Sequence, residues 1–223
     1  MQRLAMCVLR LAALMVVSVT AFEAETRAQS DCQDHVQPLQ DDEYHKALIS
    51  VLLGNEEPRG YVMWPATLIS AETVVSLHLK DGGWRVRFAW VRDPVWRYKK
   101  DSDEMDFHLD QSPEMIERGI PADLASRLVR DWHLVLERTR SESKNTTTTD
   151  GVGYVFSADG LSGEDANLRC GIGLLMNRSA VELARYAETS NPISQWSFRV
   201  RIRKLLLRIE HDEYDKIPTA SAF

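Results

Sequence analysis

The residues best suited to acid–base or metal chemistry lie in one acidic stretch and are Asp101, Asp103, Asp106, His108 and Asp110. Oxygen-rich loops bind calcium, and histidine together with aspartate suits zinc. The spacing departs from a calcium loop, because no central glycine is present and Ser112 stands where the closing glutamate would be. If residues 105–110 form a strand, Asp106, His108 and Asp110 share one exposed face. We therefore interpret the stretch as a solvated, charge-paired edge strand rather than a metal site.

Three short patterns match catalytic motifs in their letters only. His133 and Glu137 lack the second histidine and the residue order of the HExxH zinc site, and they are expected to form a surface ion pair. The pair Ser141 and Lys144 has SxxK spacing, but it lies in a Thr-rich loop instead of at the start of a buried helix. Residues 160–163 are one residue short of a GxSxG elbow. The sequence thus predicts no catalytic residue, no metal ligands and no cofactor.

Aromatic and basic side chains are mixed in residues 92–100 (RDPVWRYKK), although the chain as a whole is acidic. Aromatic and basic side chains together could bind a polyanion, a glycan or a protein partner. The alternative, which we favour, is a strand whose aromatic residues enter the core and whose cations pair with the neighbouring aspartates. The candidate binding residues are Arg92, Trp96, Arg97, Tyr98 and Lys99.

The first 28 residues are typical of a cleaved secretory signal. Arg3 and Arg10 form a basic region, and residues 11–19 form a short apolar core. Cleavage is expected after Ala28, with Ala21 as the second choice. The apolar run is well short of the ~20 residues that span a bilayer, and no second run follows. We expect a soluble mature protein without a membrane span, periplasmic or secreted, of bacterial origin.

Residues 29–223 have the size of one domain. Removal of the signal leaves 24 basic and 31 acidic residues, a net charge of −7. An acidic surface argues against nucleic acid as the main partner. Cys32 and Cys170 remain, and in an exported chain a disulfide between them is expected, with two separate thiols as the alternative.

Residues 121–140 (PADLASRLVRDWHLVLERTR) are the clearest helix of the chain. Their apolar side chains, among them Trp132, fall within an arc of about 140°. Asp131 and His133 fall on the opposite side, which is expected to face water.

Further helices are predicted at 41–53 and 179–188, and residues 193–209 favour a helix over a strand. Residues 29–40 are expected to be an irregular arm, 111–120 a linker, 141–150 a flexible polar loop, and 158–173 to lack regular structure. Strands are predicted at 60–64, 73–80, 84–92, 95–100, 105–110 and 151–157.

One strand suggests how the sheet is covered. Trp84, Val86, Phe88 and Trp90 alternate with Arg85, Arg87 and Ala89, which predicts one apolar face and one wet face. The fold class is therefore α+β, with an antiparallel meander of five or six strands and helices packed on one face.

Two functions of different class remain open. The favoured hypothesis is a non-catalytic protein of the cell envelope that binds a protein partner or an envelope polymer. The alternative is a hydrolase of an envelope polymer, with Asp106, His108 and Asp110 converging only in the folded protein.

Overall fold

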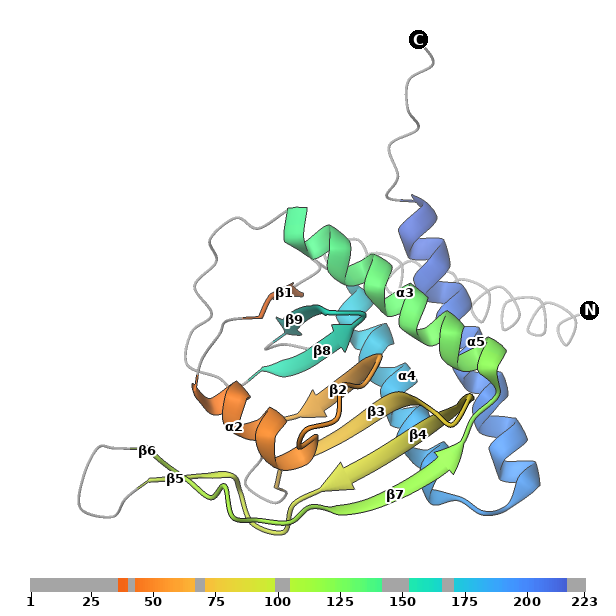
Figure 1. The fold of residues 1–223 in the computed structure, drawn as a ribbon. Helices are drawn as coiled ribbons and strands as arrows, with labels where there is room; N and C mark the ends of the chain where they lie inside the picture. Colours follow the sequence, from red (N-terminus) through yellow and green to blue (C-terminus); the bar gives the residue numbers. More distant parts are fainter. Residues whose placement is uncertain are drawn as a thin grey trace, which may run out of the picture. The chain divides into compact units, whose positions relative to one another are not determined.

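The structure is a computed structural model that describes residues 36–39, 43–66, 71–98, 105–141, 153–165 and 171–215. A seven-stranded antiparallel sheet, in the order β1-β9-β8-β2-β3-β4-β7, forms its centre (Figure 1). A separate ladder pairs β5 (Trp96–Tyr98) with β6 (Met105–Phe107). The strands of the large sheet are β1 (Gln37–Pro38), β2 (Gly60–Trp64), β3 (Thr73–Lys80), β4 (Gly83–Trp90), β7 (Glu114–Gly119), β8 (Tyr154–Ala158) and β9 (Leu161–Asp165).

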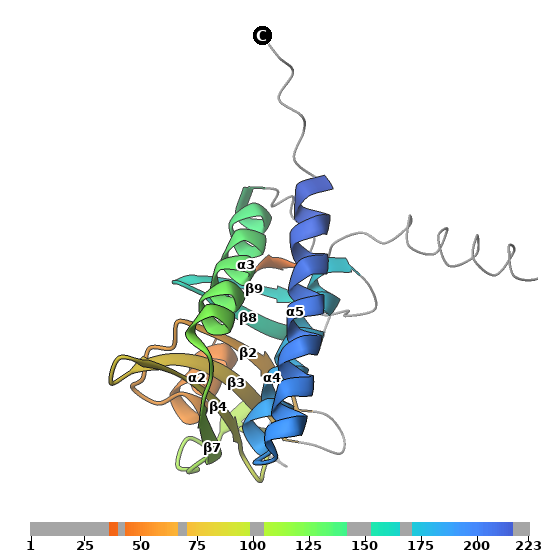
Figure 2. The ribbon, with the colours of Figure 1, turned by 90° about the vertical axis from the view of Figure 1, so that its right-hand side faces the viewer.

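Helices cover both faces of this sheet. Helix α2 (Glu43–Leu52) packs on one face, over an apolar cluster that includes Met63, Val74 and Ala89. The other face is covered by α3 (Ala122–Ser141), α4 (Gly171–Glu188) and α5 (Pro192–Asp215). Figure 2 shows α3 and α5 side by side on this second face. The predicted α+β class is confirmed, with seven strands in the large sheet and an additional helix on its opposite face.

Helix α3 confirms the prediction for residues 121–140. Trp132 is fully buried, and its indole Nε1 donates to Ser179 Oγ on α4 at 3.1 Å. A Cβ at Gly60 of β2 would lie 3.2 Å from the Ser157 carbonyl oxygen of β8 and in ordinary contact, at 3.5 Å, with the Trp132 ring. The prediction that Asp131 faces water was wrong, because α5 covers that side of α3 and leaves Asp131 only 1% exposed.

Helix α5 confirms the helical prediction for residues 193–209. Asn191 caps it, with its Oδ1 accepting from the backbone N–H of Ile193 at 2.9 Å. One side of the helix packs against α3 and α4 through Ile202, Leu206 and Ile209, which have no exposed surface.

Two segments contain more regular structure than the sequence indicated. The expected linker 111–120 holds edge strand β7, which pairs with β4, and the expected irregular segment 158–173 holds β9 and the start of α4. Both strands escaped notice because they carry few apolar residues, and backbone pairing with a neighbour defines them instead. Gln37 and Pro38, inside the expected arm, pair with Glu164 and Gly163 of β9.

The face of β4 that was expected to be wet is largely covered. Arg87 is 6% exposed and is held between Glu56 at 2.8 Å and Glu117 at 2.8 Å. Ala89, two residues further on, is buried in the cluster under α2. The covered face thus pairs its buried cation with two carboxylates, as burial of a charge requires.

Candidate functional site

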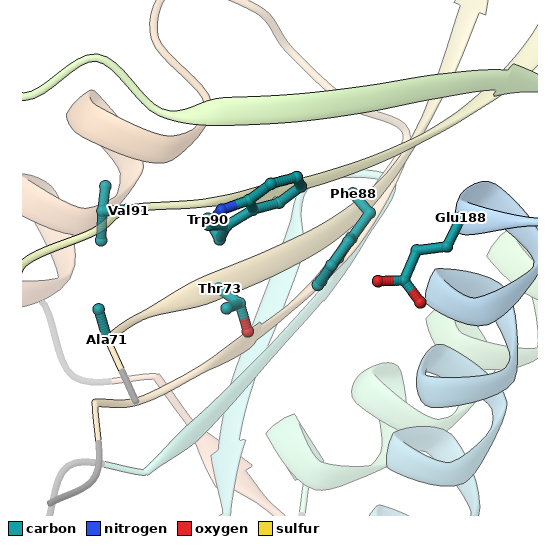
Figure 3. Close-up of a pocket in the computed structure, with 6 residues that line it drawn as sticks. All are labelled: Ala71, Thr73, Phe88, Trp90, Val91 and Glu188. Carbon is teal, nitrogen blue, oxygen red and sulfur yellow. The ribbon is translucent and has the colours of Figure 1, made fainter. Parts of the chain in front are cut away.

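A pocket of about 250 Å³ opens at one end of the sheet, on the face that α4 covers. Figure 3 shows the side chains that form it, with Phe88 and Trp90 on β4 and the carboxylate of Glu188 pointing toward Phe88. We call it the aromatic pocket. Its lining residues are Ala71, Thr73, Phe88, Trp90, Val91 and Glu188.

Strand register explains why these side chains meet. Residues two apart on a strand point to the same face, so Phe88 and Trp90 share the α4 side of the sheet. Thr73 on β3 lies directly opposite Trp90 and therefore points the same way. The pocket therefore forms because Thr73, Phe88 and Trp90 share one face of the sheet at the place where α4 ends.

The aromatic rings of the pocket form a connected group. The centroids of Phe88 and Trp90 are 5.4 Å apart with an interplanar angle of 34°, and Trp64 meets Phe88 edge-on at 6.5 Å. Trp64 is fixed in turn, because its Nε1 donates to Asn177 Oδ1 on α4 at 2.7 Å. The rings are thus held by ring contacts and by a hydrogen bond to the covering helix.

Glu188 is the last residue of α4, where the helix dipole already favours positive charge. The nearby Arg118 of β7 donates from Nε to the carbonyl oxygen of Ala187 at 3.0 Å. It forms no ion pair with Glu188. The pocket therefore keeps a carboxylate whose charge no described residue neutralises.

The polar side-chain atoms of the pocket are available to a ligand. Among the described residues, none hydrogen-bonds the Glu188 carboxylate, the Thr73 hydroxyl or the Trp90 indole N–H. One acceptor with negative charge thus lies beside aromatic ring faces and two neutral hydrogen-bonding groups. Aromatic faces with a carboxylate suit an organic cation, which the ring quadrupole and the charge both attract.

The predicted aromatic–basic residues are distributed over the β4–β7 edge and the small ladder. Arg92 bonds Glu114 at 2.5 Å, and Trp96 is half-buried against the apolar cluster under α2. In the β5–β6 register Trp96 lies opposite Phe107, and Arg97 lies opposite Asp106.

Of the other two residues, Tyr98 lies opposite Met105 in the same register, and Lys99 lies outside the described residues. The packing of Trp96 agrees with the packed alternative, whereas Arg92 pairs with a glutamate of β7 and not with the neighbouring aspartates. Ligand binding by this segment stays a prediction.

The acidic candidates do not converge in the described part of the chain. Asp106 and Asp110 are exposed, His108 is half-exposed, and no hydrogen bond or ion pair joins their side chains. No group of three or more metal-ligating side chains is present in the described residues. Asp101 and Asp103 lie outside them.

The expected surface ion pair between His133 and Glu137 does not form. His133 instead contacts the carbonyl oxygen of Ala158 through Nδ1 at 3.3 Å, which ties α3 to β8. Glu137 is exposed.

A buried cluster on the opposite face of the sheet has the contact order of a Ser–His–acid triad. Ser76 Oγ lies 2.7 Å from His78 Nε2, and His78 Nδ1 lies 3.3 Å from Glu56 Oε2. Burial, followed by the positive charge of Arg87, lowers the pKa of His78. Ser76 has no exposed surface, so a substrate carbonyl cannot reach its hydroxyl, and we interpret the cluster as structural.

That cluster belongs to a row of polar side chains that crosses the sheet. Ser157, Tyr61, Ser76, Arg87 and Glu117 are register partners on successive strands β8, β2, β3, β4 and β7. Burial raises the pKa of Tyr61, which hydrogen-bonds to serine hydroxyls of β8 and β9. Within the row, Glu117 accepts from Arg87 Nη2 at 2.8 Å, whereas Arg87 Nε is buried without a hydrogen-bond partner.

The expected signal, the cleavage site and both cysteines of the expected disulfide lie outside the described residues. No described helix combines the length and apolar character that crossing a bilayer requires.

Comparison with protein-family models, curated proteins and solved structures found no match. The assignment of a function therefore rests on the geometry of the aromatic pocket.

Sequence reasoning placed Phe88 and Trp90 on an apolar strand face but did not recognise a site there. Thr73 and Glu188 carry no motif, and their approach depends on how α4 crosses the sheet. The one available signal was Trp90, which lies near the end of the predicted strand 84–92 and is the last residue of β4, where a covering helix of ordinary length can leave the sheet open.

Proposed function

We propose that this chain is a non-catalytic binding protein of the bacterial cell envelope that holds an organic cation in the aromatic pocket. The cation is an ammonium or guanidinium group, carried by a small ligand or by a lysine or arginine side chain of a partner. The observation that supports this proposal is the unpaired Glu188 carboxylate beside the Phe88 and Trp90 rings.

The size of the pocket supports a small group. At about 250 Å³ it lies below the range of pockets that enclose drug-sized ligands, and it suits the end of a side chain. A cation over an aromatic ring contributes about 0.5–2 kcal/mol, and an exposed ion pair contributes about 0.2–1 kcal/mol. An isolated ammonium group should therefore bind with a dissociation constant near or above about 1 mM.

Tryptophan fluorescence or NMR titration tests the proposal directly. Tetramethylammonium, N-acetyl-lysine amide and N-acetyl-arginine amide are added to the purified protein, and lysine acetylated on Nζ serves as the neutral control. We expect the cations to bind and the neutral control to bind at least several-fold more weakly. A preference for arginine amide over tetramethylammonium would indicate a partner side chain, and the reverse would indicate a small quaternary ligand.

Two variants separate the contribution of the carboxylate to cation binding from that of the aromatic ring. Glu188→Gln should weaken cation binding while leaving the rings in place, and Phe88→Leu should weaken it while leaving the charge. Glu182→Gln on the same helix is the matched control, because Glu182 pairs with Arg185 and Arg201 and not with the pocket. Equal binding by wild type and Glu188→Gln would contradict the proposal.

Export is a separate part of the proposal and rests on the basic and apolar composition of residues 1–28. Mass spectrometry of the protein purified from an envelope fraction should give a chain that begins at Gln29. A chain that keeps residues 1–28 in the cytoplasmic fraction would contradict it.

A further inference from the structure

Helix α5 carries a second apolar side, which faces away from the fold. Ile193, Trp196 and Leu207 are 78%, 61% and 57% exposed, and Val200 is partly exposed. We call these four residues the outer stripe. We infer that the outer stripe binds an acidic amphipathic helix of a partner protein.

The spacing of the outer stripe is that of a helix–helix seam. Its members follow one another at three, four and seven residues, which is the heptad spacing of the apolar seam between two helices that coil around each other. At about 1.5 Å per residue, the stripe runs about 21 Å along the helix. Ile202, Leu206 and Ile209 already bury the opposite side, so packing against the described part of the chain does not account for the stripe.

The charges beside the outer stripe specify the partner. Arg199, Lys204 and Arg208 flank it, and no described residue forms an ion pair with any of them. The Nε of Arg199 is buried without a hydrogen-bond partner. Other cations of α5 are neutralised within the fold, since Arg201 binds Glu182 and Arg203 binds Asp123. A partner with aspartate or glutamate beside its apolar residues would neutralise the remaining three.

A second copy of this chain fits the stripe poorly. Antiparallel pairing of two outer stripes about their midpoint at Val200 would place Arg199 opposite Arg201 of the other copy. In the same pairing Lys204 would face Trp196 and Arg208 would face Pro192, so no carboxylate of the second copy would lie opposite any of the three flanking cations. An anionic bilayer fits less well than an acidic helix, because the chain as a whole is acidic and the spacing is that of a helix–helix seam.

The test uses a synthetic helical peptide of about 21 residues, three heptads, with leucine in the seam and glutamate beside it. A second peptide has lysine in place of each glutamate, and vesicles of phosphatidylglycerol are the third probe. We expect the purified protein to bind the glutamate peptide and to bind the lysine peptide at least tenfold more weakly. Equal binding of the two peptides, or binding to vesicles alone, would overturn the inference. A dimer in light scattering without peptide would do the same.

Trp196→Asp should weaken binding of the glutamate peptide at least tenfold. Leu79→Asp is the matched control, because Leu79 is an exposed leucine of β3 with 55% exposure and lies outside the stripe. Both replaced side chains are exposed, so both variants should unfold at the temperature of the wild type. Trp196→Asp should also keep cation binding in the aromatic pocket, which separates this inference from the proposed function. Unchanged peptide binding by Trp196→Asp would overturn the inference.

Discussion

Replacing Asp131 by asparagine should change how the stability of the fold depends on pH. Asp131 is 1% exposed between α3 and α5, and its Oδ1 accepts from Arg130 Nη2 at 2.8 Å. Arg127 lies 3.7 Å from its Oδ2, and the Glu210 carboxylate occupies the same two arginines. Burial raises the pKa of Asp131 from its ordinary 3.8 to about 6, although Arg130 and Arg127 act to lower it.

The sign of the effect follows from which state holds the proton more tightly. Between pH 3.8 and about 6 the folded protein keeps a proton on Asp131 that the unfolded chain has lost. The contribution of Asp131 to stability is therefore complete below pH 3.8 and is lost as the pH rises through about 6. A pKa difference of about two units corresponds to about 3 kcal/mol in the free energy of unfolding.

The measurement is urea denaturation of wild type and Asp131→Asn at pH 4, 5, 6 and 7, followed by far-UV circular dichroism. The free energy of unfolding of the variant minus that of wild type should increase by about 3 kcal/mol from pH 4 to pH 7. A change in hydrogen bonding to Arg130 adds a constant that does not depend on pH. A difference that stays flat across this range would refute the reasoning.

Asp123→Asn is the control on the same helix. Asp123 is exposed, and its hydrogen bond with Arg203 lowers its pKa. Its carboxylate therefore stabilises the fold above its ordinary pKa, and that stability is lost as the pH falls. The pH dependence of the control should be small and of opposite sign.

Two further predictions concern buried contacts. Glu72 is fully buried and accepts hydrogen bonds from the Tyr44 hydroxyl and the Val95 N–H, both at 3.0 Å, so Glu72→Ala should cost about 2–5 kcal/mol and Tyr44→Phe clearly less, as urea denaturation would show. A Cβ at Gly173 would lie 2.5 Å from Asp165 Oδ2, so Gly173→Ala should lower the melting temperature by several degrees, and an unchanged value would contradict the close approach.

The elements with strong periodicity could be predicted from the sequence. Trp132 and its neighbours in α3 show the helical stripe, and the glycine turn between β3 and β4 identifies a hairpin. Edge strand β7 and strand β9 could not be found in this way. Their residues, EMIERG and LSGED, carry few apolar side chains, and their conformation depends on a neighbouring strand.

Local sequence patterns could not show which helix or strand faces that look polar are covered by another element. Asp131 and Arg87 both occupy positions that a single amphipathic pattern assigns to water. Each is buried because a further part of the chain covers it. Helix α5 packs over the side of α3 that holds Asp131, and Glu56, in the turn after α2, lies over Arg87. The aromatic pocket has the same origin, since Glu188 reaches Phe88 only through the path of α4 across the sheet.

The two edge strands of the large sheet, β1 and β7, affect whether the protein aggregates at high concentration. At one end β1 is only two residues long and includes Pro38, which has no N–H to donate. At the other end β7 carries Glu114, Glu117 and Arg118 among its six residues. Edge strands that are short, contain proline or carry charged side chains are poor templates for pairing with another strand. The sheet should therefore resist amyloid-like growth by strand addition.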